Sequence, residues 1–277
     1  MLRAALVLSL LPLAAPAQEA PAPAAPGAEA VFEALQLPAM MDVLAAEGLA
    51  SSEELGASLF GPGTAPASWT ETVAGIYDAD AMREEALAGL ENALEGEDTA
   101  AMLAFFETDP GRELVALELA AREALLDEVV EEAAREAAAV AVADESPRLA
   151  LLRRYAEAND LVETNVASAL NTNFAYVRGL QEGGALGPSV TESDVLADVW
   201  SQEPEIRAEA TEWLYSFLLM AYGPASDEDI EALIAFSETE PGQALNRAVF
   251  DAFDGLFENI SRELGQASAQ QMVTEEL

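Results

Sequence analysis

The chain has 277 residues, with 51 acidic residues against 12 basic ones, a formal net charge of −39, and neither cysteine nor histidine. Every basic residue is an arginine. Without His, Cys or Lys the chain cannot build a Ser-His-Asp or Cys-His nucleophile, an ordinary zinc site, a Schiff base or a P-loop. The negative charge disfavours binding to nucleic acid and to anionic membrane surfaces. A solvated acidic coat is the simplest interpretation, and cationic peptides and divalent metals are the alternative partners.

The N-terminus has the pattern of a secretory signal peptide. Arg3 provides a positive charge, Ala4–Leu13 is apolar, and Ala15-Pro16-Ala17 is a small-residue cleavage site. We therefore predict that residues 1–17 are removed before Gln18 and that the mature protein is periplasmic. The apolar run is too short for a membrane anchor, so no stable membrane insertion is expected after cleavage.

Beyond the signal, apolar residues recur every three or four positions, which predicts helices and no sheet. We expect an all-α fold of nine or ten helices. Two stripes show this spacing, Leu114, Leu117, Ala121, Leu125, Val129 and Ala133 in one, and Leu245, Val249, Phe253, Leu256, Ile260 and Leu264 in the other. Four residues with an acid three positions later predict helix starts: Ser51, Ser68, Thr191 and Ser226.

The most informative feature is an internal repeat. Ala101–Ala121 returns 131 positions later as Ala232–Ala252, with nine of 21 positions identical. A period of this length suits a small domain rather than a solenoid unit. The sequence thus predicts two tandem pseudosymmetric helical units packed into one compact body. Their expected limits are 29–146 and 147–266, after a disordered Pro/Ala linker at 18–28 and before a C-terminal tail at 267–277.

A motif, E-T-x-P-G, stands at the centre of both copies, and its residues favour a tight corner between two helices. The threonine can cap the second helix, the proline fits its first turn, and the glycine permits a close crossing. The carboxylates Glu107 and Glu238 could alternatively belong to a site, although acids beside a helix start more often serve the helix dipole. The repeated signature is Phe105, Thr108, Pro110 and Gly111, then Phe236, Thr239, Pro241 and Gly242.

This signature, F-x-x-T-x-P-G-x-x-L followed by a long amphipathic helix, resembles the proteobacterial family of domains of unknown function numbered 2059 (DUF2059). The resemblance covers residues 96–265 as two tandem copies. It implies an exported helical protein and no established activity. The copies differ at Phe106 and Ser237, where family members often carry an aromatic residue, so the two positions are not expected to be buried alike.

One segment suggests a binding groove. Asn165 and Asn173 interrupt an apolar helix face, and several arginines lie close by in the sequence. An Asn/Arg groove at the junction of the halves could bind a carboxylate-bearing ligand or an acidic peptide. Interhelical hydrogen bonding is the alternative role. The candidate groove residues are Arg153, Arg154, Asn165, Asn173 and Arg178.

We therefore expect a non-enzymatic periplasmic protein that binds a protein partner or a small ligand at a groove between its halves, with no cofactor and no catalytic or metal-binding residues. A carboxylate-pair hydrolase of the cell envelope is the first alternative, because an Asp/Glu pair is the one catalytic system that this composition permits. An acidic divalent-cation binder is the second alternative.

Overall fold

A computed structural model describes residues 27–187 and 189–275, so the predicted signal peptide and most of the predicted linker lie outside the described residues. The described chain contains only helices, which confirms the all-α prediction, although there are thirteen of them rather than nine or ten. None is both long and apolar enough to span a bilayer. The helices are α1 (Ala28–Ala34), α2 (Leu37–Phe60), α3 (Ala67–Ile76), α4 (Ala79–Ala93), α5 (Thr99–Phe106), α6 (Asp109–Ala124), α7 (Glu128–Ala143), α8 (Pro147–Ala158), α9 (Leu161–Glu182), α10 (Glu192–Ser201), α11 (Glu203–Ala221), α12 (Asp227–Ser237) and α13 (Glu240–Glu275).

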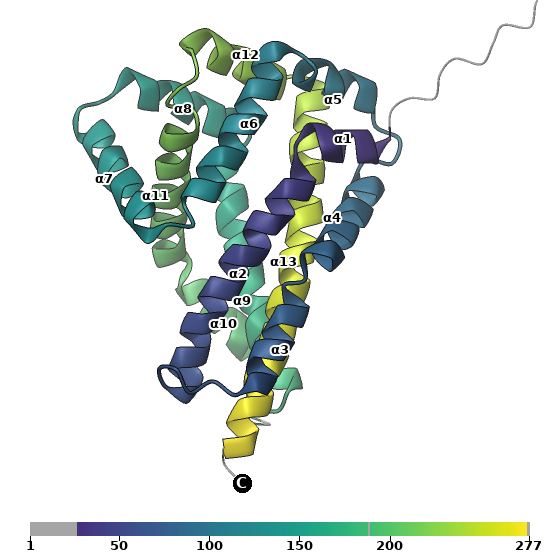
Figure 1. The fold of residues 1–277 in the computed structure, drawn as a ribbon, viewed down its shortest axis with the longest axis vertical. Helices are drawn as coiled ribbons and strands as arrows, with labels where there is room; N and C mark the ends of the chain where they lie inside the picture. Colours follow the sequence, from purple (N-terminus) through teal and green to yellow (C-terminus); the bar gives the residue numbers. More distant parts are fainter. Residues whose placement is uncertain (1–26, 188, 276–277) are drawn as a thin grey trace, which may run out of the picture.

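The long helix α13 extends through most of the molecule and packs mainly against α9 and α4 (Figure 1). Helix α7 lies at the edge and packs on α11. At the crossing of α9 and α13 the backbones touch, because a Cβ atom on Gly265 would lie 2.1 Å from the Tyr176 carbonyl oxygen. This contact positions the two helices that line the site described below.

The two expected units share their cores. In the largest core, α1, α2, α4, α5 and α6 of the first unit surround apolar residues of α13, including Leu245 and Leu256. In the second core, α8, α9, α11 and α12 of the second unit surround Leu114 of α6. Each half thus contributes one helix to the core of the other, and the boundary after residue 146 does not separate two independent bodies.

The repeated motif forms a helix corner in both places. The Thr108 hydroxyl oxygen accepts a hydrogen bond from the Gly111 N–H at 3.1 Å, and the Thr239 hydroxyl oxygen accepts one from the Gly242 N–H at the same distance. A Cβ atom on Gly111 would lie 2.2 Å from the Phe105 carbonyl oxygen, so only glycine fits this crossing. The phenylalanines that precede the corners, Phe105 and Phe236, stack on each other with centroids 4.9 Å apart.

The copies differ after the corner. In the first unit α6 ends at Ala124, and Asp127 caps α7 by accepting a hydrogen bond from the Val129 N–H at 2.9 Å. In the second unit the corresponding residue is Glu258, and α13 continues without a break. Aspartate is a strong N-cap residue, and glutamate is not among the preferred caps. The break turns α7 toward α11 and leaves Val129 77% exposed.

The structure corrects several expectations. The predicted C-terminal tail, residues 267–277, is helical as far as Glu275, and Ala267, Ser268 and Ala269 are buried because α13 continues past the expected unit boundary. Ser51 lies inside α2 and starts no helix, because the segment before it is helical as well. Thr191 and Ser226 do cap α10 and α12.

Candidate functional site

An open, mostly apolar cavity of about 480 Å³ lies where the two expected units meet. Its walls come from α2 and α6 of the first unit and from α9, α11 and α13 of the second. We call it the aromatic cavity. Its aromatic residues are Trp213, Phe217, Phe250, Phe253 and Phe257. Its polar residues are Glu118, Arg122, Asn165, Ser168 and Asp254.

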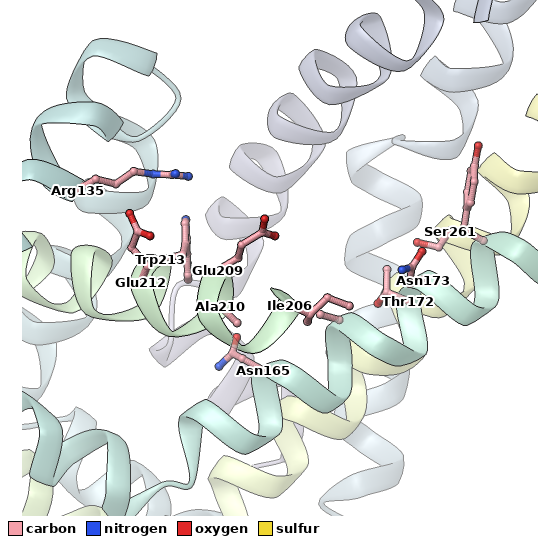
Figure 2. Close-up of a pocket in the computed structure, with 12 residues that line it drawn as sticks. Arg135, Asn165, Thr172, Asn173, Ile206, Glu209, Ala210, Glu212, Trp213 and Ser261 are labelled. Atoms are coloured by element: carbon pink, nitrogen blue, oxygen red, sulfur yellow. The ribbon is translucent and has the colours of Figure 1, made fainter. Parts of the chain in front are cut away.

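A second depression of about 750 Å³, the polar groove, adjoins the aromatic cavity and shares Asn165 and Trp213 with it. The polar groove lies between α9 and α11, with Arg135 of α7 at its margin (Figure 2). In Figure 2, Arg135 points toward Glu212 of α11. Asn173 of α9 and Glu209 of α11 also belong to its polar lining.

Two of the five predicted groove residues are brought together in the polar groove. Asn165 donates a hydrogen bond to the Leu161 carbonyl at 2.7 Å, and Asn173 donates one to the Gln202 side chain at 3.1 Å. The Asn173 bond joins α9 to Gln202 at the start of α11, as in the structural alternative, whereas the Asn165 bond stays within α9; both residues line the groove. The groove was expected at the junction of the two units, whereas this one is formed by the second unit, with Arg135 as its one described lining residue from the first.

The three predicted arginines do not line this groove. Arg154 pairs with Glu231 at 3.4 Å, Arg178 pairs with Glu182 at 3.4 Å, and Arg153 lies over the ring of Tyr215. Arg153 and Arg154 are adjacent on α8 and so point in different directions, and Arg178 lies on another helix, α9. Closeness in the sequence therefore does not bring the three side chains to one face. The groove contains Arg135 together with acids, so its lining is not specialised for an anionic ligand.

A polar cluster of Glu118, Tyr155 and Tyr222 meets the aromatic cavity through Glu118. The hydroxyl of Tyr222, which is fully buried, donates a hydrogen bond to Glu118 Oε1, and the hydroxyl of Tyr155 interacts with Tyr222. Burial raises the pKa of Glu118, and the bond from Tyr222 opposes that rise only in part. Glu118 also borders a small inner cavity of about 170 Å³. The carboxyl group of Glu118 therefore lies between two mostly apolar cavities.

A second carboxylate, Asp254 of α13, lines the aromatic cavity. Its Oδ1 atom accepts a hydrogen bond from the Ser168 hydroxyl at 2.5 Å. Burial raises the pKa of Asp254, and the nearby charge of Asp251 raises it further. The cavity therefore contains two carboxyl groups, each held by a neutral hydroxyl.

Among the described residues, Arg122 is the one basic side chain in the lining of the aromatic cavity. It pairs with Glu47 at 2.6 Å, and its guanidinium carbon lies 4.8 Å from the centre of the Trp213 ring. The Trp213 ring also stacks on Phe217, with ring centroids 5.3 Å apart. The charge of Arg122 is thus balanced by Glu47, which does not line the cavity.

Sequence reasoning missed Glu118 and Arg122, although the repeat contains a signal for both. At the offset of 131 residues, Glu118 corresponds to Val249 and Arg122 to Phe253, two members of an apolar stripe. A charge at a position that is apolar in the other copy indicates an unusual environment. All four residues line the aromatic cavity.

Comparison with known protein families finds a match to part of the chain. Residues 80–139 match the family described as uncharacterized protein conserved in bacteria (DUF2059). The resemblance to DUF2059 is thereby confirmed for this segment. No curated protein and no solved structure matches the chain significantly.

The DUF2059 segment contributes directly to both depressions. It runs from α4 into α7 and includes Glu118 and Arg122 of the aromatic cavity and Arg135 of the polar groove. The remaining walls come from helices outside the matched residues. Within the described residues, no group of three or more Asp or Glu side chains is placed to hold a metal ion. The chemistry that this arrangement offers is apolar contact, cation–π contact and hydrogen bonding.

Proposed function

We propose that the protein binds a small apolar ligand in the aromatic cavity and does not transform it. The observation that carries this proposal is a cavity of about 480 Å³ with five aromatic residues, formed at the junction of the two units. Sites for small molecules are typically concave, roughly 300–1,000 Å³ in volume, mostly apolar, and equipped with a few polar groups. The aromatic cavity has each of these properties.

A small ligand fits these observations better than a protein partner. Of the large apolar side chains that are exposed in the described chain, Val129, Val140 and Val142 lie on α7, and the others, such as Leu49 on α2 and Trp200 on α10, lie elsewhere in the fold. Single exposed apolar residues are normal on protein surfaces. The concentration of aromatic rings is instead found inside the cavity.

The hydrolase alternative has its required residue types in Glu118 and Asp254, which line one cavity. A carboxylate-pair mechanism needs one acid protonated and one ionised, so the environments should push the two pKa values apart. Burial here raises the pKa of both. The lining around the two acids is mostly apolar, with five aromatic residues, which favours binding over hydrolysis.

We further infer that the two units arose by duplication and that the cavity lies near their pseudo-twofold axis. Three observations support this: equivalent phenylalanines, Phe105 and Phe236, stack on each other; both motifs form the same corner; and both units join their first two helices through a residue with φ of 52°, Gln36 and Asp160. Such a left-handed conformation is uncommon outside glycine. A shared ancestor would explain its occurrence at both joints.

We also propose that ligand binding takes place in the periplasm, on the basis of the N-terminal signal pattern. Expression of the full gene in a Gram-negative host is expected to give a periplasmic protein that begins at Gln18. Intact-mass measurement of the periplasmic fraction checks this. A full-length protein that retains Arg3 and stays in the cytoplasm would contradict it.

The binding proposal predicts that filling the cavity abolishes uptake of an apolar probe. Val249 borders both the aromatic cavity and the small inner cavity. In Val249→Trp, the added indole ring occupies ligand space, so affinity for the neutral dye Nile red should fall at least tenfold. Titration followed by dye fluorescence measures this change.

The matched control is Val129→Trp, which adds the same group at a position that is 77% exposed. It should bind the dye like the unmodified protein. Circular dichroism shows whether each variant is folded, and Val249→Phe provides a smaller filling if the indole disrupts packing. Unchanged dye affinity in a folded Val249 variant would refute the proposed site.

A further inference from the structure

We propose that the aromatic cavity selects cationic ligands, specifically amphiphiles with an apolar chain and an ammonium head. This inference rests on the proposed function and specifies its ligand class. It follows from the charges of the cavity, from the hydrogen bonds of its carboxylates and from its aromatic lining.

The charges in and around the cavity do not cancel. Glu118 and Asp254 are the carboxylates of its lining, and Arg122 is the cation. Since the guanidinium of Arg122 pairs with Glu47 at 2.6 Å, it is already balanced from outside the lining. Two carboxylates are therefore left without a cationic partner in the described structure. An anionic ligand would add to this imbalance, whereas an ammonium group would offset it.

Both carboxylates retain capacity to accept hydrogen bonds. Glu118 accepts through Oε1 from Tyr222, and Asp254 accepts through Oδ1 from Ser168. In the described residues, neither second oxygen has a hydrogen-bond partner. A buried carboxylate is stabilised by charge-assisted hydrogen bonds, which are roughly twice as strong as neutral ones. An ammonium N–H group is the complementary donor.

The aromatic lining suits a cation as well as an apolar chain. Aromatic faces attract ammonium and guanidinium groups, and the attraction is stronger where the cation is desolvated. The protein already shows this preference, because Arg122 lies over Trp213 at 4.8 Å. Phe253 and Phe257, with centroids 6.0 Å apart, provide further rings beside Asp254.

The test compares three ligands that share one chain and differ in the head group: decylammonium, 1-decanol and decyl sulfate. Each displaces Nile red from the unmodified mature protein at 0.15 M salt, where charges on the exposed surface are screened beyond about 8 Å. Decylammonium should bind at least tenfold more tightly than 1-decanol, with one site per chain, and decyl sulfate should bind most weakly.

Two variants locate the preference. Glu118→Gln and Asp254→Asn keep the shape of each side chain and remove its charge, so the double variant should lose the advantage of decylammonium over 1-decanol. Glu113→Gln removes an exposed charge from the same helix as Glu118 and should change neither value. This control separates the cavity from the general attraction of an acidic protein for cations.

The outcomes distinguish the two levels of the proposal. If 1-decanol binds and decylammonium binds no more tightly, cation selection is wrong and the apolar site stands. If the decylammonium advantage survives in the double variant, the assigned carboxylates are wrong. If neither decylammonium nor 1-decanol binds, the proposed function fails together with this inference.

Discussion

Gly265→Ala is expected to destabilise the protein by about 3 kcal/mol, close to the upper end of the usual range for overpacking a core. The new Cβ atom would lie 2.1 Å from the Tyr176 carbonyl oxygen and 3.0 Å from the Gly179 Cα atom. Both obstacles are backbone, so the clash is relieved only if α9 and α13 move apart. Thermal unfolding followed by circular dichroism should show a decrease of roughly 10 °C in Tm.

Gly255→Ala is the matched control, because it makes the same substitution in the same helix where a Cβ atom meets nothing within 4 Å. Alanine is favoured over glycine in a helix interior by about 1 kcal/mol. This variant should therefore be more stable than the unmodified protein. Similar destabilisation by both substitutions would show that α9 and α13 do not cross in backbone contact.

The close crossing also shows what sequence periodicity can and cannot predict. The spacing of apolar residues predicted helices. The T-x-P-G motif predicted a corner between two helices because its threonine can cap a helix and its glycine permits a close crossing. A glycine inside a helix has no local signature that distinguishes contact from exposure. Gly255 and Gly265 look equivalent in the sequence, and the partner helix alone distinguishes them.

The sequence also could not predict that each unit contributes a helix to the core of the other. Helix α6 contributes to the core of the second unit and α13 to the core of the first, because the apolar stripe of each helix meets helices from both halves. Periodicity identifies a buried face but does not say which helix covers it. The break at Asp127 and the uninterrupted helix at Glu258 could have been anticipated from capping preferences.

The candidate site was located only in part. Asn165 and Asn173 were recognisable as polar groups on an apolar face, and they do border a groove, although it lies between α9 and α11 of the second unit. The arginines were grouped by proximity in the chain, which says little about proximity across helices. Glu118 was overlooked because one acid among 51 carries no signal by itself, although its alignment with Val249 does.

Glu118→Gln is expected to stabilise the protein at neutral pH and to have less effect in acid. Burial raises the pKa of Glu118 in the folded state above its ordinary value of 4.5. Its contribution to stability is therefore fully present below pH 4.5 and is lost as the pH rises through the raised folded-state pKa. Glutamine keeps an oxygen to accept the Tyr222 hydrogen bond and never ionises, so this loss disappears. Each unit of pKa shift corresponds to about 1.4 kcal/mol.

The measurement is the free energy of unfolding in urea at several values between pH 4 and pH 8. The difference between Glu118→Gln and the unmodified protein should grow with pH and level off above the folded-state pKa. Glu113→Gln, on the exposed side of the same helix, should show no such growth. A difference that stays constant with pH would mean that Glu118 titrates alike in the folded and unfolded chains. The carboxyl group would then be well solvated, and the aromatic cavity beside Glu118 would be wetter than its apolar lining indicates.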